Sequence, residues 1–266
     1  MSRITPAWEN YPPDDGADHS VTGAMRRLPG LWSPELADAR DVLVYLPPSY
    51  AAGRRRYPVL YLHDGQNLFD RATAFAGVEW GVDETLEALA ADGLEAIVVG
   101  VYHGGETRLA EYNPFPGVWR GRGQAYLRFL IETLKPIIDR DFRTLPDRAH
   151  TGILGSSMGG LISLYGFFHH PDSFGVCGAL SPSLWVGGGA IYFAVERAPF
   201  VPGRIYLDNG TREQSAQQMA QLLQARGYRP ELDLRYVVEK GGEHTEAAWA
   251  RRLPAALRFL LAPLAG

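Results

Sequence analysis

The sequence predicts an α/β protein with a mostly parallel, doubly wound sheet of about eight strands. Three observations support this fold class. From residue 57 onward, apolar runs of strand length alternate with segments whose apolar residues recur at helical spacing. The chain has 266 residues, of which 46% are hydrophobic, so it can bury one large core. A Gly-x-Ser-x-Gly pattern at 155–159 links a predicted strand to a predicted helix.

The first half of the chain predicts an irregular arm followed by four strands and two helices. Residues 1–20 are rich in Pro, Asp and Gly, which favours an arm on the surface, and residues 21–266 are expected to form a single domain. A long loop is expected at 104–123, and Pro136 is expected to kink the helix that contains it. Strands are predicted at 21–28, 41–46, 57–63 and 96–101, and helices at 80–91 and 124–139.

The second half predicts a regular alternation of strands and helices. The segment between Leu180 and Arg204 is too short to hold a large helical lid, so we expect an open cleft without a lid domain. Strands are predicted before the serine at 157 and at 174–180, 204–208 and 232–238, with helices from 158 to about 170, at 213–226 and at 245–261.

The stretch Gly155-Ser156-Ser157-Met158-Gly159 has the form of a nucleophile elbow. Ser157 is expected at the apex of a sharp strand-to-helix turn, with its hydroxyl exposed. Side chains at the two glycine positions would clash where strand and helix pack closely. The backbone N–H of Met158, at the helix start, is a candidate oxyanion donor. The alternative is a turn of small residues without chemistry.

A serine hydroxyl needs a general base beside it. His244 is the candidate, because it follows the last predicted strand in a glycine-containing loop. The alternative is an exposed loop histidine that caps the last helix. Two acids follow the penultimate strand. Asp208 ends that strand and Glu213 opens the next predicted helix, where it would also suit a capping role, and the residues alone leave both acids open.

Other residues are placed near this edge of the sheet by the predicted strands. The N–H of Gln66 is a second oxyanion candidate, and Gly65 is expected to let the backbone approach the substrate, although Asp64-Gly65 also suits an ordinary turn. Two histidines that end strands and two tryptophans on loops are candidate substrate contacts. The tryptophans are equally suited to packing against their own loops. These four residues are His63, His103, Trp119 and Trp185.

Composition excludes several other classes. A formal net charge of -4 argues against nucleic acid or an anionic membrane as partner. The single cysteine, Cys177, allows no internal disulfide and no cysteine-rich zinc site. No histidine pair has helical metal-ligand spacing, so we expect neither metal nor cofactor. The first residues lack the apolar core of a secretory signal, which predicts a cytoplasmic protein. These patterns give no oligomeric state.

Several motifs together resemble one esterase family of α/β-hydrolases. This family includes enterochelin esterases, feruloyl and acetylxylan esterases, S-formylglutathione hydrolase and mycolyltransferases. The resemblance runs from about residue 20 to the C-terminus. The matching pieces are RDVLVYLPPSY at 40–50, YLHDGQNLF at 61–69, Trp80 with Val82-Asp83, Arg108 with Glu111 to Pro114, GSSMGG at 155–160, SPSLW at 181–185, GTRE at 210–213, and His244 with Trp249.

The resemblance implies an α/β-hydrolase fold with Ser157 as nucleophile and His244 as base. It places the acid at Glu213, where many members carry Asp in Gly-Thr-x-Asp. A residue just after Asp-Gly supplies an oxyanion N–H in the mycolyltransferases, which matches Gln66. The loop at 103–123 matches no member, so substrate-binding residues do not carry over.

We therefore predict a serine carboxylic-ester hydrolase that acts on a small-molecule ester, with a short or polar acyl group, through an acyl-enzyme. One alternative is an acyltransferase that uses the same triad with an alcohol acceptor. The other is a non-catalytic binding protein on the same fold.

Overall fold

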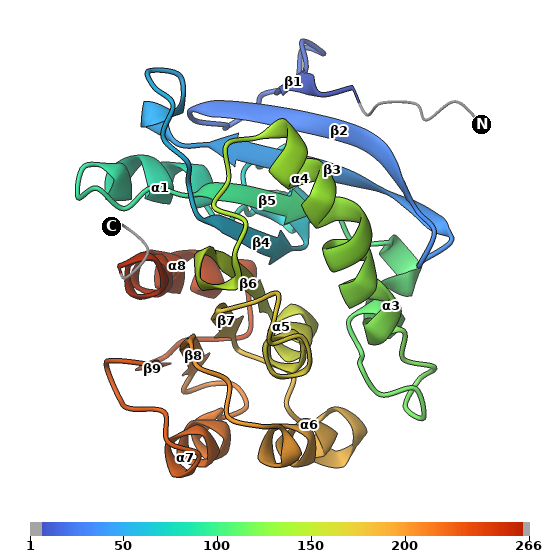
Figure 1. Ribbon diagram of the computed structural model, residues 1–266, viewed down its shortest axis with the longest axis vertical. Coiled ribbons are helices and arrows are strands. Elements are labelled where there is room, and N and C mark those ends of the chain that lie inside the picture. Colours follow the sequence, from blue (N-terminus) through green and yellow to red (C-terminus); the bar gives the residue numbers. More distant parts are fainter. Residues whose placement is uncertain (1–6, 263–266) are drawn as a thin grey trace.

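The computed structural model describes residues 7–262, and within this range nine strands form one sheet (Figure 1). The strand order is β1-β2-β3-β5-β4-β6-β7-β8-β9. The pairs from β5 through β9 are parallel, and β1, β2 and β3 extend the sheet as an antiparallel edge. The strands are β1 Glu9–Tyr11, β2 Ala24–Ser33, β3 Asp38–Leu46, β4 Val59–His63, β5 Ile97–Val101, β6 Thr151–Ser156, β7 Val176–Leu180, β8 Arg204–Gly210 and β9 Leu234–Glu239.

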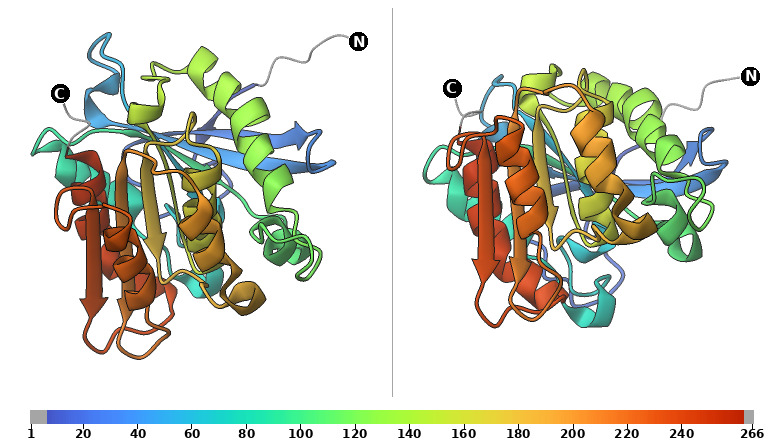
Figure 2. Two further views of the ribbon diagram at one scale, coloured as in Figure 1. Left: turned by 60° about the horizontal axis from the view of Figure 1, so that its bottom comes forward. Right: turned by 90° about the horizontal axis from the view of Figure 1, so that it is seen from below.

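Helices cover both faces of this sheet, as the views in Figure 2 show, so the predicted doubly wound α/β fold is confirmed. One face carries α1 (Val82–Ala90) and α8 (Glu246–Leu261). A short helix, α2 (Arg108–Glu111), lies in the loop after β5. The other face carries α3 (Gly123–Arg128), α4 (Lys135–Asp141), α5 (Met158–His169), α6 (Val186–Arg197) and α7 (Gln217–Ala225).

The central strands are apolar on both sides because each side meets a helix layer. In β4, Tyr61 packs into the core beneath α3 and α5, whereas its neighbour Leu62 packs into the core beneath α1 and α8. Both side chains are almost completely buried. Burial of a leucine of this kind contributes about 1.5–3 kcal/mol, so the continuous apolar run specifies a two-sided strand.

The prediction that residues 1–20 form an irregular arm is wrong for one segment. Residues 1–6 lie outside the described chain, but Glu9–Tyr11 forms β1 and pairs with β2. Tyr11 is buried and donates a 2.7 Å hydrogen bond to Asp70, and His19 also contacts Asp70. These contacts with the loop after β4 hold the segment to the sheet, and no local sequence pattern reports them.

Two predicted helices differ from the observed ones. The segment 213–226 becomes helical only at Gln217, because the Glu213 side chain turns back toward the backbone of Gly210 instead of capping a first turn. The segment 124–139 is helical throughout but contains a π-helical turn at Phe129–Leu134, which ends two residues before Pro136. Proline lacks the N–H that would continue the ordinary ladder, which accounts for the wider turn.

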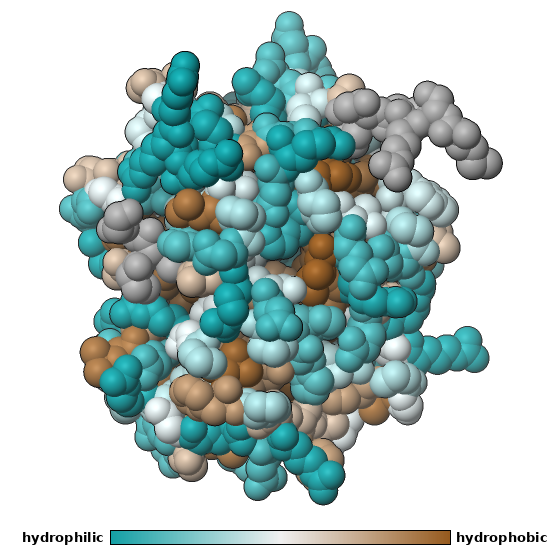
Figure 3. Space-filling model, in the orientation of Figure 1, coloured by the Kyte–Doolittle hydropathy of each residue, from teal (hydrophilic) through white to brown (hydrophobic). Residues whose placement is uncertain are grey.

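In the described chain, the connection between β7 and β8 contains α6 and no inserted lid domain, as predicted. The face in Figure 3 is mostly hydrophilic, with small and scattered apolar patches. Among residues 7–262, no helix is both long and apolar enough to cross a membrane. Because no lid domain of the described chain covers them, the loops after β4, β6, β7, β8 and β9 are open at the carboxyl edge of the sheet. Ligands bind at this edge in open α/β folds.

Candidate active site

Ser157 lies between β6 and α5 in a backbone conformation that non-glycine residues rarely adopt, with φ 55° and ψ -119°. Two hydrogen bonds hold this conformation. The Ser157 N–H donates to the carbonyl of Leu180 at 3.0 Å, and the Ser157 carbonyl accepts from the N–H of Ser183 at 2.9 Å. The neighbouring strand β7 and the loop after it thus fix the strained turn expected of an elbow.

The glycines of the elbow are required by close packing against His63. A Cβ built on Gly155 would lie 2.7 Å from the Cδ2 of His63, and one on Gly159 would lie 3.3 Å from its Cβ. His63 is buried and its ring nitrogens pair with Tyr126 (2.8 Å) and Ser163 (3.0 Å). Burial lowers the pKa of this imidazole to about 3.

The prediction that His63 contacts substrate is therefore wrong. Its ring lies beneath the elbow as a neutral packing residue, because β4 is covered by helices at the level of the strand end.

Ser157, His244 and Glu213 form one chain of hydrogen bonds. His244 Nε2 lies 2.9 Å from Ser157 Oγ, and His244 Nδ1 lies 2.7 Å from Glu213 Oε2. The three residues come from the loops after β6, β9 and β8. The imidazole side chain is 44% exposed and the carboxylate only 4%, so the ring faces solvent while the acid is shielded behind it.

Glu213 is ionised despite its burial. Burial by itself raises its pKa, but hydrogen bonds from His244, the Gly210 N–H (2.6 Å) and Ser181 Oγ (2.7 Å), together with Arg252, lower the pKa to about 2. The carboxylate thus carries its charge across the range in which an imidazole titrates.

Asp208 does not contact His244. Its Oδ1 accepts from the N–H of Ser181 at 3.0 Å and lies 3.4 Å from Arg252 Nη1. The nearby N–H groups of Gly210 and Thr211 do not bond to Asp208 either, since they donate to the Glu213 carboxylate and the Glu239 carbonyl. Burial raises the pKa of Asp208 to about 7.

Arg252 is a residue that sequence reasoning missed. It is buried on α8, where its guanidinium lies 3.2 Å from Glu213 Oε1 and donates to Ser181 Oγ at 2.8 Å. Trp249, one turn earlier, also donates to Ser181 Oγ, at 2.9 Å. The sequence contained a pattern that could have indicated this role. Arg252 falls on the apolar side of the predicted helix, with Trp249 and Leu253, and a charged side chain buried there needs a partner.

The two candidate oxyanion donors lie just beyond β6 and β4. Met158 is the first residue of α5, and the first N–H groups of a helix have no acceptor within it. Gln66 is the middle residue of the 3₁₀ turn Gly65–Asn67 that follows β4. Asp64, which precedes the turn, has φ 57° and is held by two 2.7 Å hydrogen bonds from Arg108.

The structure gives Gly65 a packing role beside the expected one. A Cβ at Gly65 would lie 2.6 Å from the backbone carbonyl carbon of Gly100, so the glycine is needed for close approach to β5.

A cavity of about 360 Å³ lies beside the hydroxyl of Ser157. Trp185 lines it, and Trp119 packs edge-on against Trp185 with ring centroids 5.7 Å apart. His103 does not line it, since its Nδ1 accepts from the Gly105 N–H at 2.9 Å. The lining residues are Ser157, Ser181, Pro182, Ser183, Trp185, Arg212, Glu213, Gln214 and His244.

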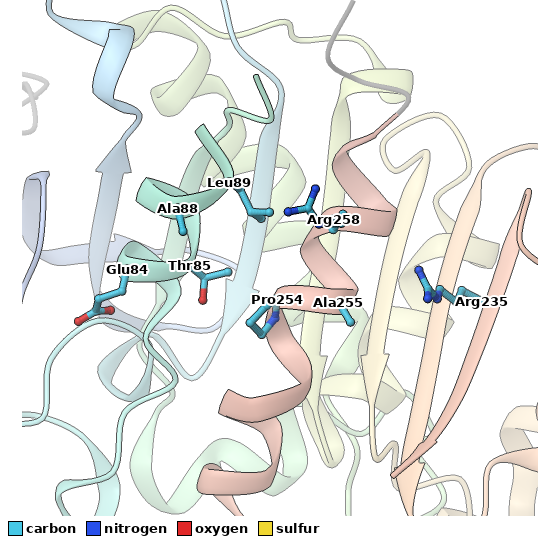
Figure 4. Close-up of a pocket in the computed structure, with 8 residues that line it drawn as sticks. All are labelled: Glu84, Thr85, Ala88, Leu89, Arg235, Pro254, Ala255 and Arg258. Carbon is cyan, nitrogen blue, oxygen red and sulfur yellow. The ribbon is translucent and has the colours of Figure 1, made fainter. Parts of the chain in front are cut away.

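A larger cavity, of about 550 Å³, lies between α1 and α8 (Figure 4). Its lining is mainly apolar and contains neither a histidine nor a serine, so it lacks the groups needed for acyl transfer. The catalytic candidates therefore belong to the smaller cavity.

Comparison with known proteins identifies a family. The model of the family described as "Putative esterase" matches residues 33–260. The chain is 28% identical over 255 residues to the uncharacterized protein YbbA of Bacillus subtilis (strain 168), an alignment that covers 88% of this chain and 97% of YbbA. It is 27% identical over 241 residues to an endo-1,4-beta-xylanase/feruloyl esterase of Xylanibacter ruminicola, covering 84% of this chain but 29% of that longer protein.

Solved structures share the fold. The enterobactin esterase FES from Shigella flexneri, crystallised in the presence of enterobactin, superimposes with a TM-score of 0.74 at 20% identity, over 92% of this chain and 61% of that one. A ferulic acid esterase gives a TM-score of 0.70 at 23% identity, over 90% and 98% of the two chains. The chain belongs to this esterase family of α/β-hydrolases and is a carboxylic ester hydrolase.

Proposed function

We propose that the protein hydrolyses short or polar acyl esters by a Ser157–His244–Glu213 triad. The observation that carries the proposal is the unbroken chain of contacts from Glu213 through His244 to Ser157, with distances of 2.7 and 2.9 Å. A nucleophile, a base within hydrogen-bond reach and an acid that orients the base are the three parts that serine acyl transfer requires.

In the proposed mechanism, His244 Nε2 removes the proton of Ser157 as Oγ attacks the ester carbonyl. The negative charge on Glu213 fixes the tautomer of the imidazole and stabilises the imidazolium that forms. The N–H groups of Met158 and Gln66 donate to the oxyanion of the tetrahedral intermediate. His244 then protonates the leaving alcohol, and the acyl-enzyme reacts with water that His244 activates.

Arg252 is proposed as a positioning residue in this scheme. Its guanidinium and the hydroxyl of Ser181 both donate hydrogen bonds to Glu213 Oε1, so Oε2 is free to contact His244. Asp208 shares the same guanidinium and is proposed to stabilise its position without taking part in proton transfer.

The cavity and the relatives both support the proposed substrate class. A cavity of about 360 Å³, bordered by Trp185 and the polar side chains of Arg212 and Gln214, suits a small acyl group with polar or aromatic character. The similar proteins named for feruloyl and enterobactin esters make such substrates the first to test. An acyltransferase reaction is the second candidate, since an open cleft also admits an alcohol. Excess alcohol would then give a transesterified product.

The nucleophile is tested by Ser157→Ala and by fluorophosphonate labelling. We expect the substitution to lower kcat by roughly 10⁴-fold or more, because triad members act as a unit, and mass spectrometry to find the label on Ser157. Ser183→Ala is the matched control, since Ser183 Oγ lies only 3.1 Å from Ser157 Oγ. That variant should keep the label and most of the activity. Labelling at Ser156 or Ser183 would refute the assignment.

A further inference from the structure

Three carboxylates converge at the N-terminal end of α1, outside the candidate active site. Glu79 precedes the helix, and Asp83 and Glu84 lie in its first turn. One carboxylate oxygen from each residue lies within 4.8 Å of the other two. Glu84 also lines the cavity between α1 and α8, and Figure 4 shows its carboxylate pointing away from Pro254 and Ala255 of α8.

No basic side chain of the described residues pairs with these three carboxylates. Asp83 is completely buried; its Oδ2 accepts from the Thr22 N–H at 2.6 Å, but its Oδ1 is buried without a hydrogen-bond partner. Glu79 accepts from Ser20 Oγ through Oε1, and its Oε2 is likewise buried without a partner. Among residues 7–262, no arginine, lysine or histidine forms an ion pair with any of the three.

The positive end of the helix accounts for only part of this arrangement. Acidic side chains in a first helical turn are favoured, which suffices for the exposed Glu84. It does not explain why Glu79, which lies outside the helix, is directed toward the same point, or why Asp83 is completely buried with an Oδ1 that no donor of the described chain reaches. Burial, and then the neighbouring Glu84, raise the pKa of Asp83, as expected for a buried carboxylate beside a second one.

We propose that Glu79, Asp83 and Glu84 bind a hard divalent cation, with calcium as the best fit. Calcium takes oxygen ligands at about 2.3–2.6 Å and accepts irregular geometry, so oxygens spaced as these are can share one ion. The cation would supply the missing positive charge and the missing partners of the two buried oxygens. Since Thr22 and Ser20 bond to the same carboxylates, the ion would also fasten the segment before β2 to α1.

The site is tested on the whole chain after treatment with a chelator. Trp80 lies next to Glu79, so a terbium ion bound there should show luminescence when tryptophan is excited, and calcium should compete for it. Calorimetric titration with calcium should give one site per chain. Saturating calcium should raise Tm by roughly 5 °C, because a ligand that binds only the folded state stabilises it.

Glu84→Gln, at an exposed position that should not affect folding, is expected to weaken calcium binding at least about tenfold, and Asp83→Asn to abolish it. Asp172→Asn, which removes an exposed carboxylate far along the chain, is the matched control and should bind as the wild type does. No calcium heat and no terbium signal in the wild type would overturn the proposal. So would unchanged binding in both Asp83→Asn and Glu84→Gln. The proposal would also be overturned if calcium left the Tm of the wild type unchanged while Asp83→Asn raised the Tm. That result would indicate that the three carboxylates share a proton instead of a cation.

Discussion

At the scale of single residues, the choice between two carboxylates decides how the proposed triad works. Asp208 lies within β8 and Glu213 lies five positions further on, in the loop after that strand, and both contact Arg252. Only Glu213 reaches His244. The strand fixes Asp208 at the floor of the site, whereas the loop beyond Gly210 lets the longer glutamate side chain turn toward the neighbouring histidine loop.

Glu213→Gln should lower kcat by about 10²–10⁴-fold, because the neutral amide neither fixes the tautomer of His244 nor stabilises its cation. The amide oxygen can still accept from Ser181 and Gly210, so Tm should change little. Asp208→Asn should mainly alter stability and retain most of the activity. An active Glu213→Gln beside a folded, inactive Asp208→Asn would transfer the role to Asp208. Steady-state kinetics and thermal unfolding of both variants provide the comparison.

At the scale of elements, α8 is more than a cover for one face of the sheet. Its first turn is capped by Thr245, whose hydroxyl accepts from the Ala248 N–H, and this places His244 directly before the helix. Arg252 lies on the buried side of the same helix, where it contacts the loops after β7 and β8. The same helix therefore places the proposed base and supports the proposed acid.

Arg252→Gln should lower kcat about tenfold or more with little change in KM, because Glu213 loses its support while the cleft is unchanged. It should also destabilise the fold by about 3 kcal/mol, since it leaves two buried carboxylates without their shared cation. Arg251→Gln, the adjacent exposed residue paired with Glu239, is the control and should be near wild type in both measurements. Equal effects of the two substitutions would contradict a positioning role.

At the scale of the whole molecule, the open carboxyl edge of the sheet governs which esters fit. Within the described chain, no lid domain covers Ser157, and the adjacent cavity holds about 360 Å³. We expect kcat/KM to be highest for p-nitrophenyl acetate or butyrate and at least about tenfold lower for the palmitate ester. A maximum at palmitate, together with activation at an oil–water interface, would be incompatible with this open site.

The stability of the whole molecule should depend on pH through the buried His63. Its folded-state pKa of about 3 lies below the ordinary 6.5, so its contribution is complete above pH 6.5 and is lost as the pH falls toward 3. At pH 5 the loss amounts to about 2 kcal/mol, since only the unfolded chain binds the proton.

Denaturant unfolding at pH 7 and pH 5 should show this loss in the wild type. The same comparison for His63→Gln, which cannot take up the proton, should show a smaller one. In the wild type, the ring resonances of His63 should not shift between these pH values. A titrating His63 signal, or equal pH dependence in both proteins, would show that the imidazole is not held neutral.

The sequence by itself determined the class of the fold, most of the alternating strands and helices from β4 onward, the elbow at Ser157 and the placement of His244. It did not predict β1 or α6. These features depend on short-range patterns: apolar runs of strand length, helical periodicity, and glycines where the chain turns sharply. Family resemblance then favoured Glu213, and its contact with His244 agrees with that expectation.

Only the tertiary structure decided the roles that depend on packing between distant segments. His63 is buried because helices from later in the chain cover its strand, and β1 forms because Tyr11 reaches Asp70. Arg252 becomes a partner of Glu213 only when α8 packs beneath β8. The sequence does not report whether a carboxylate, an imidazole or a guanidinium is exposed to solvent or packed against a buried charge. The fold brings its partner into reach, and that contact sets both its pKa and its function.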